Sequence, residues 1–204
     1  DRPLSLGRDM DWGITEAVRG GATMVQLREK DCDTREFIRL AARLKEVLSP
    51  LGVPLLINDR VDVALAVDAD GVHIGQSDMP YETARRLLGP GKIIGLSVEN
   101  LDEVLEANKL DVDYIGVSPV YSTTTKTDTA VPFGLDGLAE AVSLSIHPTV
   151  AIGGMNPATA HDVICTGTDG IAVVSAICSA DSPKEAAREL SAIIETARRK
   201  QREC

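Results

Sequence analysis

The chain has 204 residues, of which 44% are hydrophobic and 25% charged, so it can bury a sizeable core and does not have the composition of a disordered protein. Aromatic residues make up only 3%, and the core must therefore be aliphatic. The formal net charge of -10 argues against a general nucleic-acid or anionic-membrane surface, because either would need a positive field.

Cysteine spacing and hydropathy further narrow the class of protein. The cysteines lack any CxxC spacing, which favours free thiols over a zinc site or a disulfide framework; they are Cys32, Cys165, Cys178 and Cys204. No apolar run approaches the roughly 20 residues needed to span a bilayer, and no signal peptide is visible. We therefore expect a cytoplasmic protein, and the sequence leaves open a homo-oligomer.

In chain order, a loop and a helix over residues 1–21 are followed by short β-branched runs that alternate with longer amphipathic ones. The runs predicted as strands are 22–28, 53–58, 70–75, 92–97, 113–118, 148–154 and 169–175. The runs predicted as helices are 33–49, about 80–88, 100–109, 134–144, 157–166 and 183–199. Asp33 is expected to cap the first of these helices.

Strand–helix alternation predicts an α/β fold with a parallel sheet. A TIM (βα)8 barrel needs eight strands, whereas seven are visible, so we expect the first strand to lie upstream of Asp1. No Pro/Gly/Ser-rich linker divides the chain, which predicts a single domain over residues 1–204. A doubly wound sheet is the alternative, but no GxGxxG follows the first visible strand, and polar residues sit at many strand ends.

Polar or glycine residues follow almost every predicted strand, where a barrel builds its active site. In chain order they are Gln26, Arg28, Lys30, Asn58, Asp59, Asp78, Ser97, Thr123, Thr125, Lys126, Gly153, Gly154, Val174 and Ser175. Three of them, Arg28, Lys30 and Lys126, are cations that a pyrophosphate could neutralise together.

Two successive strands each deliver one carboxylate, Asp59 and Asp78. Magnesium typically takes one or two carboxylates together with substrate phosphate oxygens and water, so the pair predicts a shared Mg2+. The glycine pair that ends the predicted strand 148–154 and the VVSA at the end of 169–175 predict a second, metal-free anion site that binds through backbone N–H groups.

Each signal also has a plainer structural interpretation. QLREK alone could be a strand followed by solvated charges, Asp59 could merely cap the next helix, and the glycine pair could be only a tight turn. His73 is expected to be packed in its strand or to lie at the mouth. The weight of the functional interpretation comes from the co-occurrence of these signals at successive strand ends.

Several segments closely resemble the thiamine-phosphate synthase (thiamine-phosphate pyrophosphorylase) family. They are GGATMVQLREKD, PLLINDRVDVALAVDADGVHIGQSDMP, IGLS, DYIGVSPVYSTTTK, FGLDGL, VAIGGM and GIAVVSAI. The resemblance spans nearly the whole chain and implies a TIM barrel. It also implies a magnesium-dependent transferase that joins 4-amino-2-methyl-5-(hydroxymethyl)pyrimidine diphosphate to a thiazole phosphate, with thiamine phosphate and pyrophosphate as products.

By position, the resemblance also implies roles for individual residues. The pyrimidine diphosphate would be bound by Gln26, Leu27, Arg28, Glu29, Lys30, Asn58, Ser97 and Lys126. Of these, the catalytic charges would be Arg28, Lys30 and Lys126. Magnesium would be held by Asp59 and Asp78. The thiazole phosphate would be held by Thr123, Thr125, Gly154, Val174 and Ser175.

Two other functions remain to be separated from this one. A thiazole tautomerase would share the thiazole-phosphate pocket but would not need QLREK, both carboxylates and the lysine of TTTK together. A non-catalytic metabolite-binding regulator would be expected to have lost Asp59, Asp78 or Lys126, and all are present. The partners expected are thus small-molecule substrates, with no nucleic acid and no membrane.

Overall fold

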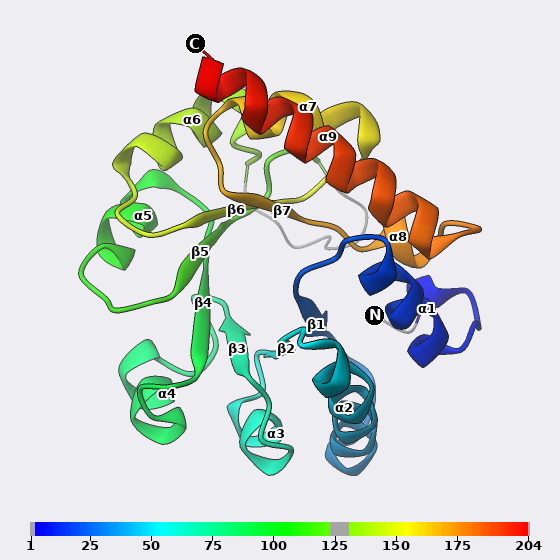
Figure 1. Cartoon of the computed structure of the whole chain (residues 1–204). Coiled ribbons are helices and arrows are strands. Elements are labelled where there is room, and N and C mark those ends of the chain that lie inside the picture. Colours follow the sequence, from blue (N-terminus) through cyan, green and yellow to red (C-terminus); the bar gives the residue numbers. More distant parts are fainter. Residues whose placement is uncertain (1–2, 123–130, 204) are drawn as a thin grey trace.

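The computed structural model describes residues 3–122 and 131–203. Seven parallel strands form one sheet whose order follows the chain, from β1 to β7. The strands are β1 (Val25–Leu27), β2 (Leu55–Asn58), β3 (Gly71–Ile74), β4 (Ile93–Val98), β5 (Tyr114–Val117), β6 (Thr149–Ile152) and β7 (Gly170–Ala172). Figure 1 shows the sheet curling around an open centre, with the helices on its outer side.

The helices lie between the strands, as the alternation predicts. They are η1 (Pro3–Ser5), α1 (Met10–Arg19), α2 (Thr34–Leu48), η2 (Ser49–Leu51), α3 (Val61–Ala66), α4 (Tyr81–Leu88), α5 (Leu101–Ala107), α6 (Gly134–Leu144), α7 (Pro157–Cys165), α8 (Ser175–Cys178) and α9 (Pro183–Glu203). Every predicted strand and helix is confirmed to within a few residues. The short helices α3 and α8 were not predicted, because so few residues give little periodicity.

The strand order confirms a barrel-type fold and excludes the doubly wound alternative. A doubly wound sheet reverses its strand order at a switch point, whereas this sheet runs sequentially and curls. Among the described residues, β1 and β7 are the two ends of the sheet. That an upstream strand closes the gap between them stays a prediction, as does the single domain.

Helix α2 shows how the sequence specifies the outer layer. The Asp33 carboxylate accepts a hydrogen bond from the backbone N–H of Glu36 at 2.9 Å, which confirms the predicted N-cap. Buried apolar residues recur along one face at helical spacing: Phe37, Leu40, Ala41, Leu44 and Leu48. The inner layer is equally apolar, since all four residues of β3 and of β5 are buried, as expected for parallel strands covered on both faces.

An aspartate directly precedes β3, β5 and β7 and ties each strand to its neighbour at the amino-terminal edge of the sheet. Its carboxylate accepts the backbone N–H of a residue at the start of the preceding strand at 2.8 Å, and its own N–H donates to the carbonyl of that same residue. The three pairs are Asp70 with Leu55, Asp113 with Ile94, and Asp169 with Thr149. The repeating unit is therefore a pair of βα units, larger than the single βα unit visible in the sequence.

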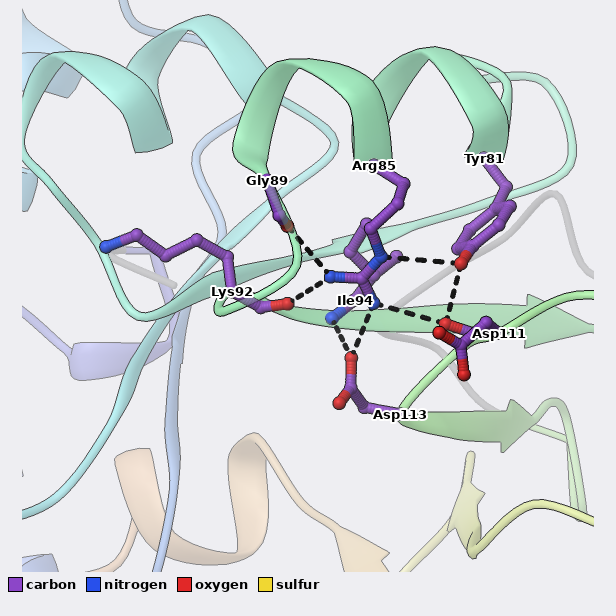
Figure 2. A network of polar contacts seen from close by, with 7 residues as sticks. All are labelled: Tyr81, Arg85, Gly89, Lys92, Ile94, Asp111 and Asp113. Atoms are coloured by element: carbon purple, nitrogen blue, oxygen red, sulfur yellow. Dashed lines mark hydrogen bonds and ion pairs between the residues drawn. The ribbon is translucent and has the colours of Figure 1, made fainter.

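Arg85 of α4 extends one of these ties into a polar network (Figure 2). Its guanidinium donates to Asp113 Oδ2 at 2.9 Å and to the carbonyl of Lys92 at 2.6 Å. Longer hydrogen bonds reach the Tyr81 hydroxyl and the carbonyls of Gly89 and Asp111. Arg85 thus joins the end of α4 to the starts of β4 and β5, away from the strand ends predicted to carry chemistry.

Two further expectations concern cysteines and membranes. Within the described part of the chain, Cys32, Cys165 and Cys178 form no disulfide, in line with the free-thiol interpretation, and Cys204 lies outside it. Of the helices in residues 3–122 and 131–203, none combines the length and the apolar character required to cross a membrane.

Candidate active site

Parallel strands bring their carboxyl ends to one edge of the sheet, and most of the predicted site residues lie there. Residues 26–30 end β1 and begin the loop after it, Asn58 ends β2, Asp59 and Asp78 follow β2 and β3, and Ser97 lies near the end of β4. Gly153 and Gly154 follow β6, and Val174 and Ser175 follow β7. Thr123, Thr125 and Lys126 lie outside the described residues.

Asp59 has an unusual backbone that turns its side chain into this edge. Its φ of 63° is in the left-handed region, which residues other than glycine rarely adopt but Asp tolerates better than most. Its N–H donates to the carbonyl of His73 at 2.8 Å, and its carboxylate accepts from the Lys30 ammonium. Helix α3 begins after Arg60 with no side-chain cap, so Asp59 does not serve as the helix cap that the sequence left open.

Asp78 lies next to Asp59. Its Oδ2 accepts the backbone N–H of Gly75 at 2.7 Å. Burial raises the pKa of the Asp78 carboxyl, and the adjacent Asp59 carboxyl raises it further, against the opposing effect of Gly75 N–H and Lys30. Two carboxylates and one ammonium therefore form a single electrostatic cluster, built from the loops after β1, β2 and β3.

This cluster fits the magnesium that the family resemblance implies. The Asp59 carboxyl raises the pKa of Asp78, and a cation between two like charges relieves such repulsion. Carboxylate oxygens are the hard ligands that Mg2+ prefers. Within residues 3–122 and 131–203, no group of three or more His, Cys, Asp or Glu side chains could hold a metal alone. Two carboxylates suit an ion whose other ligands are substrate phosphate oxygens and water.

The residues around the acidic pair differ in what they can offer a ligand. Lys30 and Gln26 are exposed, whereas Arg28, Glu29 and Asn58 are half-buried. Leu27 is also predicted to bind the substrate, but its side chain is 1% exposed and packs in the core. Only the backbone of that residue is left to contact a substrate.

The glycine pair after β6 occupies backbone conformations that a side chain would strain. Gly153 and Gly154 have φ of 97° and 74°, and a Cβ on Gly154 would lie 2.7 Å from the Cβ of Tyr121. The carbonyl of Gly154 accepts from the side chains of Asn156 and Thr159, which also form the capping box of α7. These bonds fix the turn to the start of α7. Because the turn follows β6, it lies at the same edge of the sheet as the acidic pair.

Helix α8, which begins at Ser175, is held at its far end by a residue that the sequence did not single out. The Arg8 guanidinium donates to the carbonyls of Cys178 at 3.0 Å and Ala180 at 2.5 Å. The Ser179 hydroxyl adds a hydrogen bond to the carbonyl of Leu4 at 2.9 Å. A cation at the carboxyl end of a helix is electrostatically favourable, and here it anchors the segment that carries Val174 and Ser175.

Ser97 is hydrogen-bonded to His73 and, through His73, linked to Tyr114, and the sequence indicated no role in the site for either residue. His73 is buried rather than at the mouth, with Nε2 2.8 Å from Ser97 Oγ and Nδ1 2.8 Å from the Tyr114 hydroxyl. His73 follows strand alternation, and its inward direction was predictable, but its partners come from β4 and β5 and could not be read from spacing.

The fold and this site define an α/β-barrel protein with charged side chains gathered at the carboxyl ends of its strands. A family model described as thiamine monophosphate synthase matches residues 5–177, and the chain belongs to that family. It is 53% identical over 182 residues to thiamine-phosphate synthase of Vibrio parahaemolyticus, covering 89% of each chain. It is 52% identical over 200 residues to that of Chloroflexus aurantiacus, covering 98% of this chain and 92% of the relative.

A solved structure agrees with the family. Thiamine phosphate pyrophosphorylase from Pyrococcus furiosus superposes with a TM-score of 0.88 at 43% identity, covering 97% of this chain and 93% of that one. A 3-hexulose-6-phosphate synthase superposes with a TM-score of 0.66 at 17% identity, which is a likeness of fold alone. The chain is thus an enzyme of the thiamine monophosphate synthase family.

Proposed function

We propose that this protein joins 4-amino-2-methyl-5-(hydroxymethyl)pyrimidine diphosphate to a thiazole phosphate, releasing thiamine phosphate and pyrophosphate. Membership of the thiamine monophosphate synthase family supports the reaction. The observation in this chain that supports it most directly is the cluster of Asp59, Asp78 and Lys30 at the carboxyl ends of adjacent strands. Such a cluster suits a metal-bound diphosphate better than a neutral ligand.

This reaction requires stabilisation of charge rather than transfer of a proton. The C–O bond to the diphosphate breaks, its electron pair leaves with pyrophosphate, and the electron-rich pyrimidine carries the positive charge. The thiazole nitrogen then donates its lone pair to that carbon and forms the new C–N bond. Cations fixed near the leaving group lower this barrier, and a second subsite that holds the thiazole adds proximity.

Each predicted residue takes a role in this scheme. Lys30 and Arg28, with Lys126, neutralise the departing pyrophosphate, while Asp59 and Asp78 would hold Mg2+. When bound, the ion would supply Lewis-acid stabilisation to the diphosphate oxygens. Lys30 pairs with Asp59, and its exposed ammonium would also be available to the leaving group.

The remaining residues bind and orient. The pyrimidine diphosphate contacts would come from Gln26, Glu29, Asn58 and Ser97, and from the backbone of Leu27. The thiazole phosphate contacts would come from Thr123, Thr125, Gly154, Val174 and Ser175. Two subsites on one edge of the sheet keep the reacting atoms of both substrates close together.

Direct turnover tests the proposal against its alternatives. Both phosphorylated substrates are incubated with the protein and Mg2+, and thiamine phosphate and pyrophosphate are quantified by chromatography. Formation of both products in equal amounts supports the transferase. Isomerisation of the thiazole alone would indicate a tautomerase, and tight binding without turnover would indicate a regulator.

The metal role is tested by removing one carboxylate at a time. Asp59→Asn and Asp78→Asn should each raise the Mg2+ concentration needed for half-maximal rate by at least about 10-fold, since even outer-shell changes typically weaken metal sites by that much. Asp62→Asn is the matched control, because Asp62 is an exposed aspartate three residues from Asp59 and pairs with Arg60. An unchanged Mg2+ requirement in both site variants would exclude them as ligands.

The leaving-group role is tested at the cations. Arg28→Ala and Lys126→Ala should each lower kcat by about 10²-fold or more, the usual effect of losing one preorganised donor. The circular dichroism spectrum of Arg28→Ala should stay unchanged, because the Arg28 side chain is half-buried and does not belong to the described core. Near-normal kcat in both variants would contradict charge stabilisation by these residues.

A further inference from the structure

A buried chain of polar side chains crosses three neighbouring strands and ends at the candidate active site. It consists of Tyr114 on β5, His73 on β3 and Ser97 on β4, and we call it the Tyr114–His73–Ser97 relay. The two links are each 2.8 Å, from the Tyr114 hydroxyl to His73 Nδ1 and from His73 Nε2 to Ser97 Oγ. His73 is 5% exposed and Tyr114 is 9% exposed, so water is nearly excluded from the first link.

Two glycines leave room for the rings of the relay. A Cβ on Gly95 would lie 2.1 Å from the Tyr114 ring, and a Cβ on Gly116 would lie 2.9 Å from His73 Cε1. Real Cβ atoms essentially never lie within 3.0 Å of a non-bonded atom, so a side chain at either position would displace a ring. The rings themselves pack with centroids 5.5 Å apart. Packing therefore fixes the geometry of both hydrogen bonds.

The direction of the hydrogen bonds follows from the hydroxyl of Tyr114. Burial raises the pKa of this hydroxyl, so it keeps its proton at neutral pH and has one hydrogen to donate. In the described part of the chain its hydrogen-bond partner is His73 Nδ1. Reversing the bond would leave a buried hydroxyl hydrogen unsatisfied, which is unfavourable.

The rest of the relay follows from that first bond. When Nδ1 accepts from Tyr114, neutral His73 carries its hydrogen on Nε2 and donates it to Ser97 Oγ. The oxygen of Ser97 is then engaged as an acceptor, and its own hydrogen points away from His73. The hydrogen of the Ser97 hydroxyl is therefore directed toward a ligand and not toward His73.

We propose that Tyr114 and His73 are positioning residues that direct the hydroxyl hydrogen of Ser97 toward the ligand, and that the site thereby selects a pyrimidine whose ring nitrogen accepts this bond. The inference rests on the proposed function in one respect, namely that Ser97 faces the pyrimidine. A ring nitrogen is an acceptor, whereas a C–H at the same place would leave the serine hydrogen unpaired, and sites built around such a bond reject analogues that lack it.

The relay should act on binding rather than on the chemical step. Ionisation makes the pyrimidine ring positive, and a donor to its nitrogen gives no added stabilisation to that charge. Losing the relay should therefore raise KM for the pyrimidine diphosphate and leave kcat nearly unchanged.

Tyr114→Phe is the decisive variant, because it removes the hydroxyl and keeps the ring that fills the space over Gly95. The first readout is the ¹⁵N chemical shifts of the His73 ring. The chain has three histidines, and the signals that disappear in a His73→Asn variant identify those of His73. The wild-type protein should show hydrogen on Nε2 only, and Tyr114→Phe should show a mixture of tautomers or hydrogen on Nδ1. Hydrogen on Nδ1 in the wild-type protein would overturn the inference.

The second readout is steady-state kinetics. Tyr114→Phe should raise KM for the pyrimidine diphosphate about 10-fold, as for one lost hydrogen bond, with kcat within about 3-fold. Tyr81→Phe is the matched control, because the Tyr81 hydroxyl donates to the carbonyl of Asp111 at 2.6 Å in the network of Figure 2. It should change neither the tautomer of His73 nor KM.

A double-mutant cycle separates a relay from two independent effects. Ser97→Ala should raise KM by itself, and adding Tyr114→Phe to it should change KM no further if Tyr114 acts only through Ser97. Additive increases would overturn the relay. The tautomer measurement needs no substrate, so a wild-type protein without turnover would refute the proposed function while the relay would still be judged by NMR.

Discussion

Replacing Arg85 with alanine should destabilise the protein without affecting catalysis. The guanidinium makes two short hydrogen bonds, to the Lys92 carbonyl at 2.6 Å and to Asp113 Oδ2 at 2.9 Å, besides three longer ones (Figure 2). A hydrogen bond from a charged donor contributes about 1.5–3 kcal/mol, so the two short ones together would contribute at least about 3 kcal/mol if fully buried. The side chain is 19% exposed, and water can replace part of the network, which lowers the expected loss to about 2–3 kcal/mol.

The assay is urea unfolding followed by far-UV circular dichroism, with thermal unfolding as a second measurement. A loss of that size corresponds to a decrease in Tm of about 5–10 °C for a chain of this length. Arg86→Ala is the matched control, because Arg86 is the next residue of α4 and is exposed. It should change the free energy of unfolding by less than about 0.5 kcal/mol. Equal stability of the two variants, or a selective loss of kcat in Arg85→Ala, would refute the reasoning.

Two further predictions concern the amino-terminal edge of the sheet. Asp70→Asn should lower the free energy of unfolding by about 1 kcal/mol at neutral pH and by progressively less as the pH falls below 3.8. Burial raises the pKa of Asp70, but its hydrogen bond and ion pair with Lys45 outweigh this and hold the pKa below its usual 3.8. The contribution of Asp70 to the free energy of unfolding is therefore present above pH 3.8 and is lost as the pH falls through the lowered pKa. The check is urea unfolding of both proteins from about pH 3 to pH 7, and a difference independent of pH would contradict it. Gly71→Ala should lower the free energy of unfolding by about 3 kcal/mol or more, because its Cβ would lie 2.0 Å from the carbonyl oxygen of Ile93. Gly91→Ala is the control: a Cβ there would have open space around it, so the free energy of unfolding should hardly change in the same measurement.

Hydrophobic periodicity was sufficient to predict the order and type of the main elements. The apolar runs LLIN and YIGV became fully or almost fully buried strands, and the helical pattern after Asp33 became α2 with the expected cap. These features are local, because burial of a strand or of one helix face follows from residues close together in the chain. The short helices α3 and α8 were missed since four to six residues carry too little periodicity.

The site could be predicted only as a set of candidates. Strand ends identified Asp59 and Asp78, but whether Asp59 would cap the next helix or face Asp78 depended on its left-handed backbone. Likewise His73 was recognisable as an inward residue of a strand, whereas its bonds to Tyr114 and Ser97 join segments 41 and 24 residues away.

The sequence by itself determined that this is a parallel α/β protein whose strand ends carry cations, carboxylates and glycines, because those properties depend on residue type and short-range spacing. Tertiary structure alone decided which of these groups meet: the pairing of Lys30 with Asp59, the effect of the Asp59 carboxyl on Asp78 and the relay behind Ser97. The physical reason is that distances across the curled sheet are set by strand register and side-chain packing, and neither is encoded in the spacing of any one segment.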